Sequence, residues 1–264
     1  MDTNEVSVHL PFKTIVNCRD LAGITNREGK VIKPSRLLRS ASLAHADRHD
    51  LDTLANMQID DIVDLRTEAE KLTSPDKTVV PMKEHHYPVF HEKDLKDAAG
   101  SQAAIIYEAA DDSRMFMQSV YRQMIVSEDA KKAWKNFFQL LLNAPNGVLW
   151  HCTQGKDRTG IAAVLILTAL DVDEKTIIED YMQTNRYMTH KAEVDHMTLK
   201  ALIPHHERLA DQDIETYMFA HEDFYQAAKA AAVDNWGSFE GYLREAIGLS
   251  DEDFARLKEL YLES

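Results

Sequence analysis

The stretch Leu149–Gly160, LWHCTQGKDRTG, contains residue types at a spacing suited to nucleophilic attack on an anion. Cys152 ends a short apolar run and stands six residues before Arg158. If that run is a strand and a helix begins near Arg158, the residues between them form a tight loop whose backbone N–H groups converge at a helix N-terminus. Such a loop binds anions and lowers the pKa of a thiol aimed at its centre. We therefore expect Cys152 to be a thiolate nucleophile.

The other residues of the loop suit an anion of the phosphate type. Gly155 permits a positive φ where the loop reverses, and Gly160 allows the first turn of the helix to lie close to neighbouring backbone. The planar fork of Arg158 can hold two phosphate oxygens, which lysine cannot do. The residues expected to bind phosphate with Arg158 are Thr153, Gln154, Gly155, Lys156 and Thr159. The sequence thus predicts a cup for a phosphate dianion.

Four side chains of this stretch have more specific expected roles. Asp157 can donate a proton to a leaving alkoxide or phenoxide. Thr159 can hydrogen-bond the sulfur and help it depart when water cleaves the phosphorylated cysteine. Lys156 is expected to add positive charge at the rim of the loop. His151 is expected to brace the loop through backbone hydrogen bonds and not to act as a base.

Two structural alternatives compete with this interpretation. A single buried cysteine is most often only a small apolar side chain, but the His, Gly, Arg and Thr-Gly at fixed positions around Cys152 favour catalysis. The string GKDRTG also suggests a nucleotide-binding loop. That motif needs a Gly where Trp150 stands and a Ser or Thr where Asp157 stands, so we reject it. Cys18 has no such surroundings and is expected to fill the core.

The composition limits the classes of partner. The 264 residues carry a formal net charge of −14, which disfavours nucleic acid and anionic membranes as partners. The start, MDTNEVSVHL, lacks the pattern of a signal peptide, and no apolar run is long enough to span a membrane, so a cytoplasmic protein is expected. The two cysteines and the pairs His85-His86 and His205-His206 have no ligand set at a recognised metal spacing. We expect no metal and no cofactor.

Alternating strand and helix patterns predict an α/β fold that positions the loop. The predicted strands are FKTIVNC, VIKPSRLLRSASL, IDDIVDLR, HHYPVF and VLWHC. Helical spacing covers His45–Met57, Ser101–Asn143, the segment GIAAVLILTAL and most of the chain after Asp173. Within the second of these, Met117, Val120, Tyr121 and Met124 share one face, which is expected to pack in the core.

These elements predict one domain with a central, mostly parallel sheet flanked by helices. Its parts are N-terminal strands and a helix over about 1–90, a helical segment over 91–143 that could form a lid, the loop strand and helix over 144–170, and C-terminal helices over 171–264. No Pro/Gly/Ser-rich linker divides the chain.

The string HCTQGKDRTG resembles the signature H-C-x5-R-[ST] of the cysteine-dependent protein tyrosine phosphatases. Its GKDR form resembles the bacterial branch of tyrosine and phosphoinositide phosphatases found in Listeria and mycobacteria. Further segments similar to that branch are NCRDLAGI, RLLRSASL, IVDLRTEAE, EDYMQTNRY and GYLREAIGLS. The resemblance implies the tyrosine-phosphatase fold and a phosphomonoesterase that works through a phosphocysteine. It covers the chain from about Val16 onward, most weakly over 90–129 and 191–235.

The same resemblance implies roles for individual residues. Cys152 would be the nucleophile, Arg158 the phosphate clamp and Asp157 the general acid, since this branch places its acid inside the loop. No W-P-D tripeptide is present to supply an acid from elsewhere. Asp64, beside Arg66 at a strand end, is the alternative acid, and its competing role is an ion pair with Arg66.

The expected substrates are phosphotyrosine proteins or peptides, and Lys156 resembles the extra base of relatives that also accept phosphoinositides. Inorganic phosphate and vanadate are expected to bind in the loop. Two other classes of function remain open. One is a module that binds phosphorylated ligands without releasing product, and the other is a sulfurtransferase with a persulfide on the cysteine.

Overall fold

The computed structural model describes residues 5–90, 113–187 and 216–263. A six-stranded sheet in the order β1-β2-β4-β7-β5-β6 forms its centre. The strands are β1 (Val8–His9), β2 (Arg19–Asp20), β4 (Leu37–Ser40), β5 (Ile59–Asp64), β6 (Lys83–His86) and β7 (Gly147–His151). Strands β4, β7, β5 and β6 pair in parallel, whereas β2 pairs antiparallel with both β1 and β4. The predicted α/β class with a mostly parallel sheet is confirmed. A separate small sheet pairs β3 (Val31–Ile32) with β8 (Leu262–Glu263).

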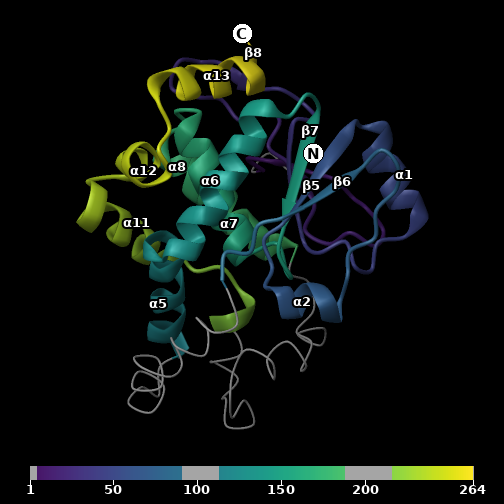
Figure 1. Ribbon diagram of the computed structural model, residues 1–264, viewed down its shortest axis with the longest axis horizontal. Helices are drawn as coiled ribbons and strands as arrows, with labels where there is room; N and C mark the ends of the chain where they lie inside the picture. Colours follow the sequence, from purple (N-terminus) through teal and green to yellow (C-terminus); the bar gives the residue numbers. More distant parts are fainter. Residues whose placement is uncertain (1–4, 91–112, 188–215, 264) are drawn as a thin grey trace.

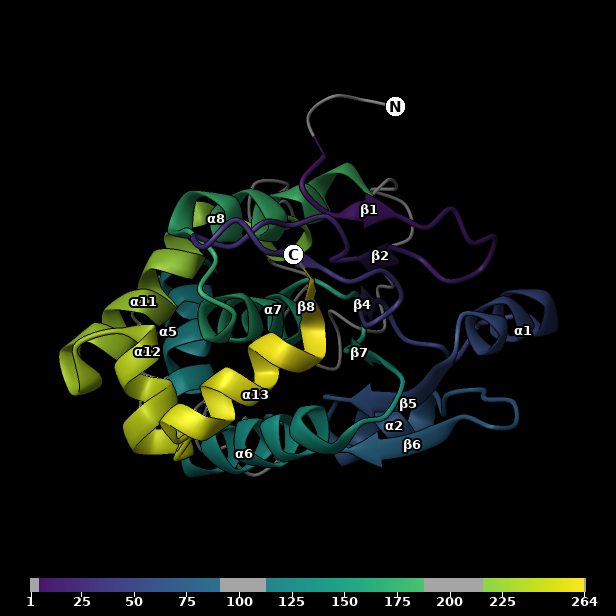
Figure 2. The same cartoon turned by 90° about the horizontal axis from the view of Figure 1, so that it is seen from above.

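Helices cover both sides of the central sheet (Figures 1 and 2), with α1 on one side and α5, α6, α7, α8 and α11 on the other. The longer helices are α1 (Arg48–Asn56), α5 (Ser113–Val126), α6 (Glu128–Asn143), α7 (Asp157–Ala169), α8 (Glu174–Gln183), α11 (Glu222–Trp236) and α13 (Asp251–Tyr261). The shorter ones are α2 (Glu68–Thr73), the 3-10 turn η2 (Thr184–Arg186), α12 (Phe239–Tyr242) and the π-helical turn η4 (Leu243–Ile247).

The central strands contribute to two hydrophobic cores because successive residues on a strand point to opposite faces. The smaller core, under α1, contains Leu38, Ile62, Leu149, Leu51 and Leu54. The larger core, under the other helices, contains Leu37, Val63, Val148 and Trp150 from the same strands. Helix α7 belongs to the larger core and is buried along most of its length, which explains why its sequence is apolar nearly all round.

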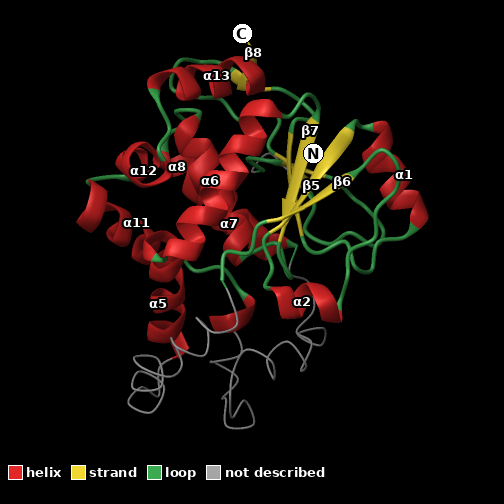
Figure 3. Ribbon diagram, viewed as in Figure 1, coloured by secondary structure: helices red, strands yellow, loops and turns green. Residues whose placement is uncertain are grey.

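Three of the parallel strands end side by side at one edge of the sheet. Ser40, the last residue of β4, pairs with His151, the last residue of β7, and His151 also pairs with Asp64, the last residue of β5. Helix α2 lies at this same end of the sheet (Figure 3). The segment that follows β7 therefore begins between the ends of two neighbouring strands.

Most of the predicted elements are present, but one strand is not. Phe12–Cys18 was expected to be a strand, and it is a loop that precedes β2. Ile15 and Cys18 are buried in the smaller core, and Asn17 has a φ of 53°, which strand pairing excludes. The apolar pattern there reflects the burial of a loop. The strand expected over HHYPVF overlaps only the end of β6.

The predicted helical segment 101–143 is described from Ser113 onward, and residues 91–112 lie outside the described ranges. Trp134, Phe137 and Phe138 of α6 are fully buried in the larger core, so α6 is a core layer and not part of a lid. Within α5, Met117, Tyr121 and Met124 are buried as predicted. No helix in the described ranges is both long and apolar enough to cross a membrane.

Candidate active site

Cys152 lies directly after β7, and the chain then turns through Thr153 and Gly155 before α7 begins at Asp157. The first intrahelical bond of α7 runs from the N–H of Gly160 to the carbonyl of Lys156, 2.9 Å. The N–H groups before Gly160 have no acceptor within the helix and carry its partial positive charge. Cys152, which is 2% exposed, is thus held at the N-terminal end of α7. Negative charge is favoured at this position.

Side chains behind the loop hold its carbonyl groups. Asn17 donates from Nδ2 to the carbonyl oxygens of Gln154 (3.2 Å) and Gly155 (3.1 Å). Arg39, on β4, also donates to the carbonyl of Gly155 (3.1 Å). In a trans peptide the C=O and the following N–H point in opposite directions. With these carbonyls held from behind, the N–H groups of Gly155 and Lys156 face the inside of the loop, as an anion site requires.

A buried carboxylate in turn holds Arg39. Asp180, on α8, pairs with Arg39 at 2.6 Å and with Arg19 at 3.5 Å, and all three side chains are almost fully buried. Burial alone would raise the pKa of Asp180, but the charges of Arg19 and Arg39 outweigh it and the pKa is lowered. Burial and the charge of Arg39 lower the pKa of Arg19 to about 9. Asp180 therefore stays ionised and fixes the two cations behind the loop.

Gly155 has a φ of +69°, which confirms the positive φ expected at the loop reversal. A Cβ atom there would lie 2.5 Å from the carbonyl carbon and oxygen of Ser40 and 2.7 Å from the N of Ala41. These are backbone atoms at the end of β4, so they cannot rotate away as a flexible side chain would. Only glycine satisfies both the conformation and the space.

Replacing Gly155 by alanine is expected to lower the free energy of unfolding by about 3 kcal/mol, because left-handed strain and a backbone clash act together. The measurement is chemical denaturation. Gly29→Ala is the matched control, since Gly29 also has a positive φ (+79°) but would place its Cβ in open space. It is expected to lose only about 1 kcal/mol. Equal losses in the two variants would contradict the clash at Gly155.

Arg158, in the first turn of α7, forms a bidentate ion pair with Glu70 of α2. Nη1 lies 2.6 Å from Oε2, and Nη2 lies 2.8 Å from Oε1. The hydroxyl of Thr153 also donates to Oε1 of Glu70 and lies 3.4 Å from Nη2 of Arg158. Glu70 also caps α2 by accepting from the N–H of Thr67. The orientation of the guanidinium is therefore fixed from outside the loop.

The ion pair keeps both of its members charged. Burial alone would lower the pKa of Arg158, but the charge of Glu70 outweighs it, with smaller contributions from Cys152 and Asp157, and the pKa is raised. Burial alone would raise the pKa of Glu70, but the charge of Arg158 outweighs it and that pKa is lowered. Cys152 is among the groups that raise the pKa of Arg158, so the sulfur and the guanidinium share one electrostatic environment.

Asp157, the first residue of α7, is held on one side by buried donors. Its Oδ1 accepts a hydrogen bond from the hydroxyl of Tyr121 (2.5 Å) and lies 3.2 Å from Nζ of Lys156. Tyr121 and the Lys156 side chain are fully buried, whereas the Asp157 side chain is 22% exposed. The carboxyl group thus lies between the packed interior and solvent.

Lys156 is not at the rim of the loop, and that prediction was wrong. Its side chain is fully buried, and Nζ donates to the carbonyl oxygens of Tyr217 (2.7 Å) and Phe219 (3.3 Å) as well as facing Asp157. The charge is turned inward because three oxygen atoms there replace its water. Any contact of Lys156 with phosphate would come from its backbone N–H.

Two further expectations for the start of α7 were also wrong. Thr159 was expected to hydrogen-bond the sulfur, but its Oγ1 is buried and has no hydrogen-bond partner among the described residues. Gly160 was expected to let backbone approach, but its Cβ position faces the ring of Tyr181 at 3.0 Å. Gly160 makes room for an aromatic side chain.

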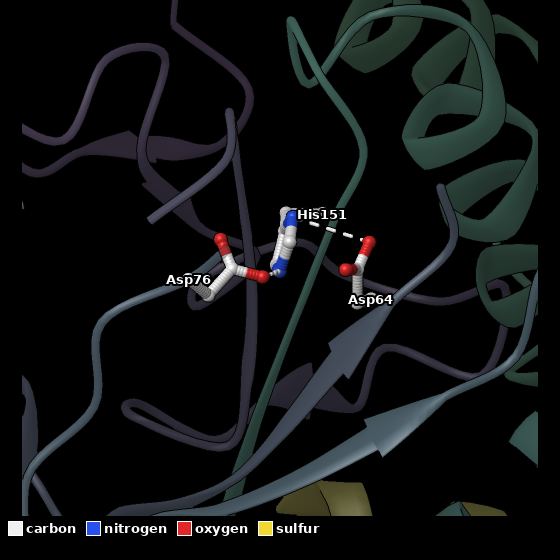
Figure 4. Close-up of side chains that lie close together, drawn as sticks. All are labelled: Asp64, Asp76 and His151. Atoms are coloured by element: carbon white, nitrogen blue, oxygen red, sulfur yellow. Dashed lines mark ion pairs between the residues drawn. The ribbon is translucent and has the colours of Figure 1, made fainter. Parts of the chain in front are cut away.

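His151 lies between two carboxylates at the edge of the sheet (Figure 4). Its Nδ1 is 3.2 Å from the carbonyl oxygen of Cys152 and 4.0 Å from Oδ1 of Asp64, and its Nε2 is 3.0 Å from Oδ2 of Asp76. The contact with Cys152 confirms the expected backbone brace. Arg66 donates to both oxygens of Asp64 at 2.9 Å and to Asp76 at 2.7 Å. The alternative role of Asp64, an ion pair with Arg66, is thus confirmed.

Asp64, Asp76 and His151 could offer ligand atoms to a metal ion, since these atoms lie within 4.8 Å of one another. The guanidinium of Arg66 already pairs with both carboxylates and would repel a cation. Burial alone would raise the pKa of Asp64, but Arg66 and His151 lower it. This cluster therefore supports the start of the loop as an ion-pair network.

Cys18, His85 and His86 have structural surroundings. Cys18 is buried in the smaller core, on the other face of the sheet from the core that contains Cys152, and burial raises its pKa. Nε2 of His85 lies 2.8 Å from Oδ1 of Asp61, and Nε2 of His86 lies 2.8 Å from the carbonyl oxygen of Arg66. The predictions of a core cysteine and satisfied histidines are confirmed for these positions. His205-His206 lies outside the described residues.

Sequence reasoning missed the residues that hold the loop from a distance. They are Asn17, Arg39, Glu70, Tyr121 and Asp180. A signal was present for Glu70, because Thr67 and Glu70 have the spacing of a capping box at the start of α2. Tyr121 fell on the apolar face of a predicted helix, so its hydroxyl was not given a role.

The chain is similar to known proteins along most of its length. A family model described as "Tyrosine phosphatase family" matches residues 10–263. A protein of Cupriavidus necator named as a tyrosine-protein phosphatase is 31% identical over 255 residues, which cover 96% of this chain and 88% of the relative. The triple specificity protein phosphatase PtpB of Mycobacterium tuberculosis is 27% identical over 271 residues, covering 93% and 96%. A crystal structure of P. aeruginosa TpbA in complex with pTyr matches at 15% identity, with 88% and 99% coverage and a TM-score of 0.35.

The family match spans the segment that supplies Asn17 and Arg39 as well as the loop itself and the C-terminal helices. The match therefore extends over nearly the whole chain and is not limited to the short signature. The chain belongs to the tyrosine phosphatase family.

Proposed function

We propose that the chain hydrolyses phosphomonoesters, phosphotyrosine foremost, with Cys152 as the nucleophile. The observation that carries this proposal is the position of Cys152 at the N-terminal end of α7, together with Arg158 held in place by Glu70. Its membership in the tyrosine phosphatase family, where the C. necator relative has the same named activity, supports the same reaction.

In the first step the thiolate of Cys152 attacks phosphorus, and the bond between phosphorus and the leaving oxygen breaks. The leaving oxygen takes the electron pair and a proton from Asp157. In the second step water attacks the phosphocysteine, the S–P bond breaks and the thiolate returns, while Asp157 takes a proton from the water. The net reaction consumes one water and releases the alcohol or phenol and inorganic phosphate.

Arg158 is proposed to clamp the phosphoryl group from the edge that Glu70 leaves free. Glu70 bonds to Nη1 and Nη2, which form the end-on edge of the guanidinium. The side-on edge, made by Nε and one Nη, keeps two parallel N–H donors for two phosphate oxygens. With the inward N–H groups of the loop, this clamp would oppose the charge that develops on those oxygens.

Asp157 is the proposed general acid, and the surroundings of Asp64 support that choice. Asp64 is bound on both oxygens by Arg66 and its pKa is lowered, so it holds no proton to donate near neutral pH. Asp157 is partly exposed and begins the helix at whose end Cys152 lies. Its position suits proton transfer to a substrate oxygen bound in the loop.

The proposal also covers the range of substrates and the cellular location of the protein. Phosphoinositides were expected because Lys156 resembles the extra base of relatives that accept them, but the side chain of Lys156 is buried. PtpB is named a triple specificity phosphatase, which supports a range wider than phosphotyrosine. Vanadate is proposed to bind in the loop as a mimic of the trigonal-bipyramidal transition state. The cytoplasmic location expected from the sequence stays a prediction.

A substrate panel tests the proposed function by release of inorganic phosphate. The panel contains a phosphotyrosine peptide, a phosphoserine peptide, a phosphoinositide in mixed vesicles and a soluble inositol phosphate. The phosphotyrosine peptide is expected to have the highest kcat/KM, by about tenfold or more. Vanadate is expected to inhibit, and EDTA to have no effect. Binding without phosphate release would favour a recognition module, and a persulfide on Cys152 without vanadate inhibition would favour sulfur transfer.

A further inference from the structure

Two buried tyrosines connect α5 and α8 to the proposed acid. The hydroxyl of Tyr181 donates to the hydroxyl oxygen of Tyr121 (2.8 Å), which donates to Oδ1 of Asp157 (2.5 Å). Both tyrosines are fully buried, and their rings meet edge to face with centroids 6.2 Å apart. Asp157 is only partly buried, so the chain of hydroxyls runs from the core toward the loop.

A buried hydroxyl and a buried ammonium group meet the same oxygen of Asp157. Tyr121 bonds to Oδ1, and Nζ of Lys156 also faces Oδ1 at 3.2 Å. Among the described residues, no hydrogen bond involves Oδ2 of Asp157. When the carboxyl group is neutral its proton must sit on one oxygen. An oxygen that already accepts from Tyr121 and faces the ammonium group of Lys156 is the poorer position, so the proton belongs on Oδ2.

The direction of donation along the two tyrosine hydroxyls is fixed by the groups around them. Tyr181 donates into the oxygen of Tyr121, so the proton of Tyr121 is directed to Asp157. Burial is the largest cause of a raised pKa for both tyrosines, and the charge of Asp157 adds to it. Both phenols therefore remain protonated, and Tyr121 remains a donor over the whole range in which such an enzyme would work.

We propose that Tyr121, with Tyr181 behind it, is a positioning residue that directs Oδ2 of Asp157 toward the leaving oxygen. This inference rests on the proposed function, because it assigns a role within that reaction. Lys156 also acts on Oδ1, because its ammonium group faces that oxygen. Its charge would therefore act on the proposed acid and not at the rim of the loop, where it was expected. A phenylalanine would fill the same space in the core, so the hydroxyl is what the role requires.

The test compares Tyr121→Phe with the wild type on two aryl phosphates. Phenyl phosphate has a poor leaving group that needs a proton, and 2,4-dinitrophenyl phosphate has one that leaves without help. Tyr121→Phe is expected to lower kcat about tenfold on phenyl phosphate and by less than about twofold on the dinitrophenyl ester. Asp157→Asn gives the reference, with a loss of about a hundredfold on phenyl phosphate alone. Inhibition by vanadate is expected to stay unchanged in Tyr121→Phe.

The ratio of the two rates is measured on one preparation, so it does not depend on the fraction of enzyme that is folded. Tyr242→Phe is the matched control, since Tyr242 is also fully buried but its hydroxyl has no hydrogen-bond partner among the described residues. Its ratio is expected to equal that of the wild type. Lys156→Met removes the ammonium group that faces Oδ1 and is expected to shift the ratio in the same direction as Tyr121→Phe.

The outcomes separate the two proposals. An active wild type with unchanged ratios in Tyr121→Phe and Lys156→Met would overturn the positioning role and leave the proposed function standing. Equal losses on both substrates would also overturn it, because a merely structural defect acts on every substrate. A wild type that hydrolyses neither ester would overturn the proposed function and the positioning role together.

Discussion

Replacing Cys152 by serine is expected to lower kcat by about a thousandfold or more while a phosphotyrosine peptide still binds. A serine hydroxyl is far less acidic than a thiol, so the field at the start of α7 does not ionise it at neutral pH. The N–H groups of the loop and Arg158 are untouched, so ground-state binding is retained. Steady-state kinetics and calorimetric titration with the peptide measure the two effects.

Cys18→Ser is the matched control for this variant. Cys18 is as deeply buried as Cys152 but lies in the core on the opposite face of the sheet. Its replacement is expected to reduce stability, because a hydroxyl is placed among apolar side chains, and to leave kcat unchanged. Turnover near the wild-type level in Cys152→Ser would mean that the sulfur is not the nucleophile, and the phosphocysteine mechanism would have to be abandoned.

Replacing Arg158 by alanine is expected to lower kcat/KM about a thousandfold and to weaken phosphate binding as well. The variant loses both donors of the clamp, and it also leaves Glu70 as an unpaired carboxylate beside the loop. That negative charge would repel a phosphate dianion. Arg158→Lys keeps the charge without the planar fork and is expected to recover only a small part of the activity.

A second substitution separates the two causes of the Arg158→Ala loss. The double variant Arg158→Ala/Glu70→Gln removes the unpaired charge, so it is expected to bind inorganic phosphate more tightly than Arg158→Ala alone. Arg48→Ala is the control for removing an arginine, because Arg48 is exposed on α1 and pairs with Asp52 of the same helix. Full activity in Arg158→Lys would show that charge alone suffices and would exclude the bidentate clamp.

Local chemistry explains why the loop could be predicted from sequence. Cys152, Gly155 and Arg158 are close in the chain, and their roles depend on a strand end, a reversal and a helix start that short-range patterns encode. The apolar runs that became β5, β7 and α7 reflect burial in layers, which also follows from local patterns. The same reasoning failed at Phe12–Cys18, where burial of a loop produced a strand-like pattern.

The sequence by itself therefore predicted the α/β class and the strand end, reversal and helix start around Cys152, because these follow from patterns within short segments of the chain. Tertiary structure decided the direction of Lys156, the partner of Arg158 and the donors to Asp157. Glu70 and Tyr121 reach the loop from positions 88 and 36 residues away in the chain. Such contacts depend on how α2 and α5 pack against the sheet and α7, and no local pattern specifies which polar atom a buried side chain will meet.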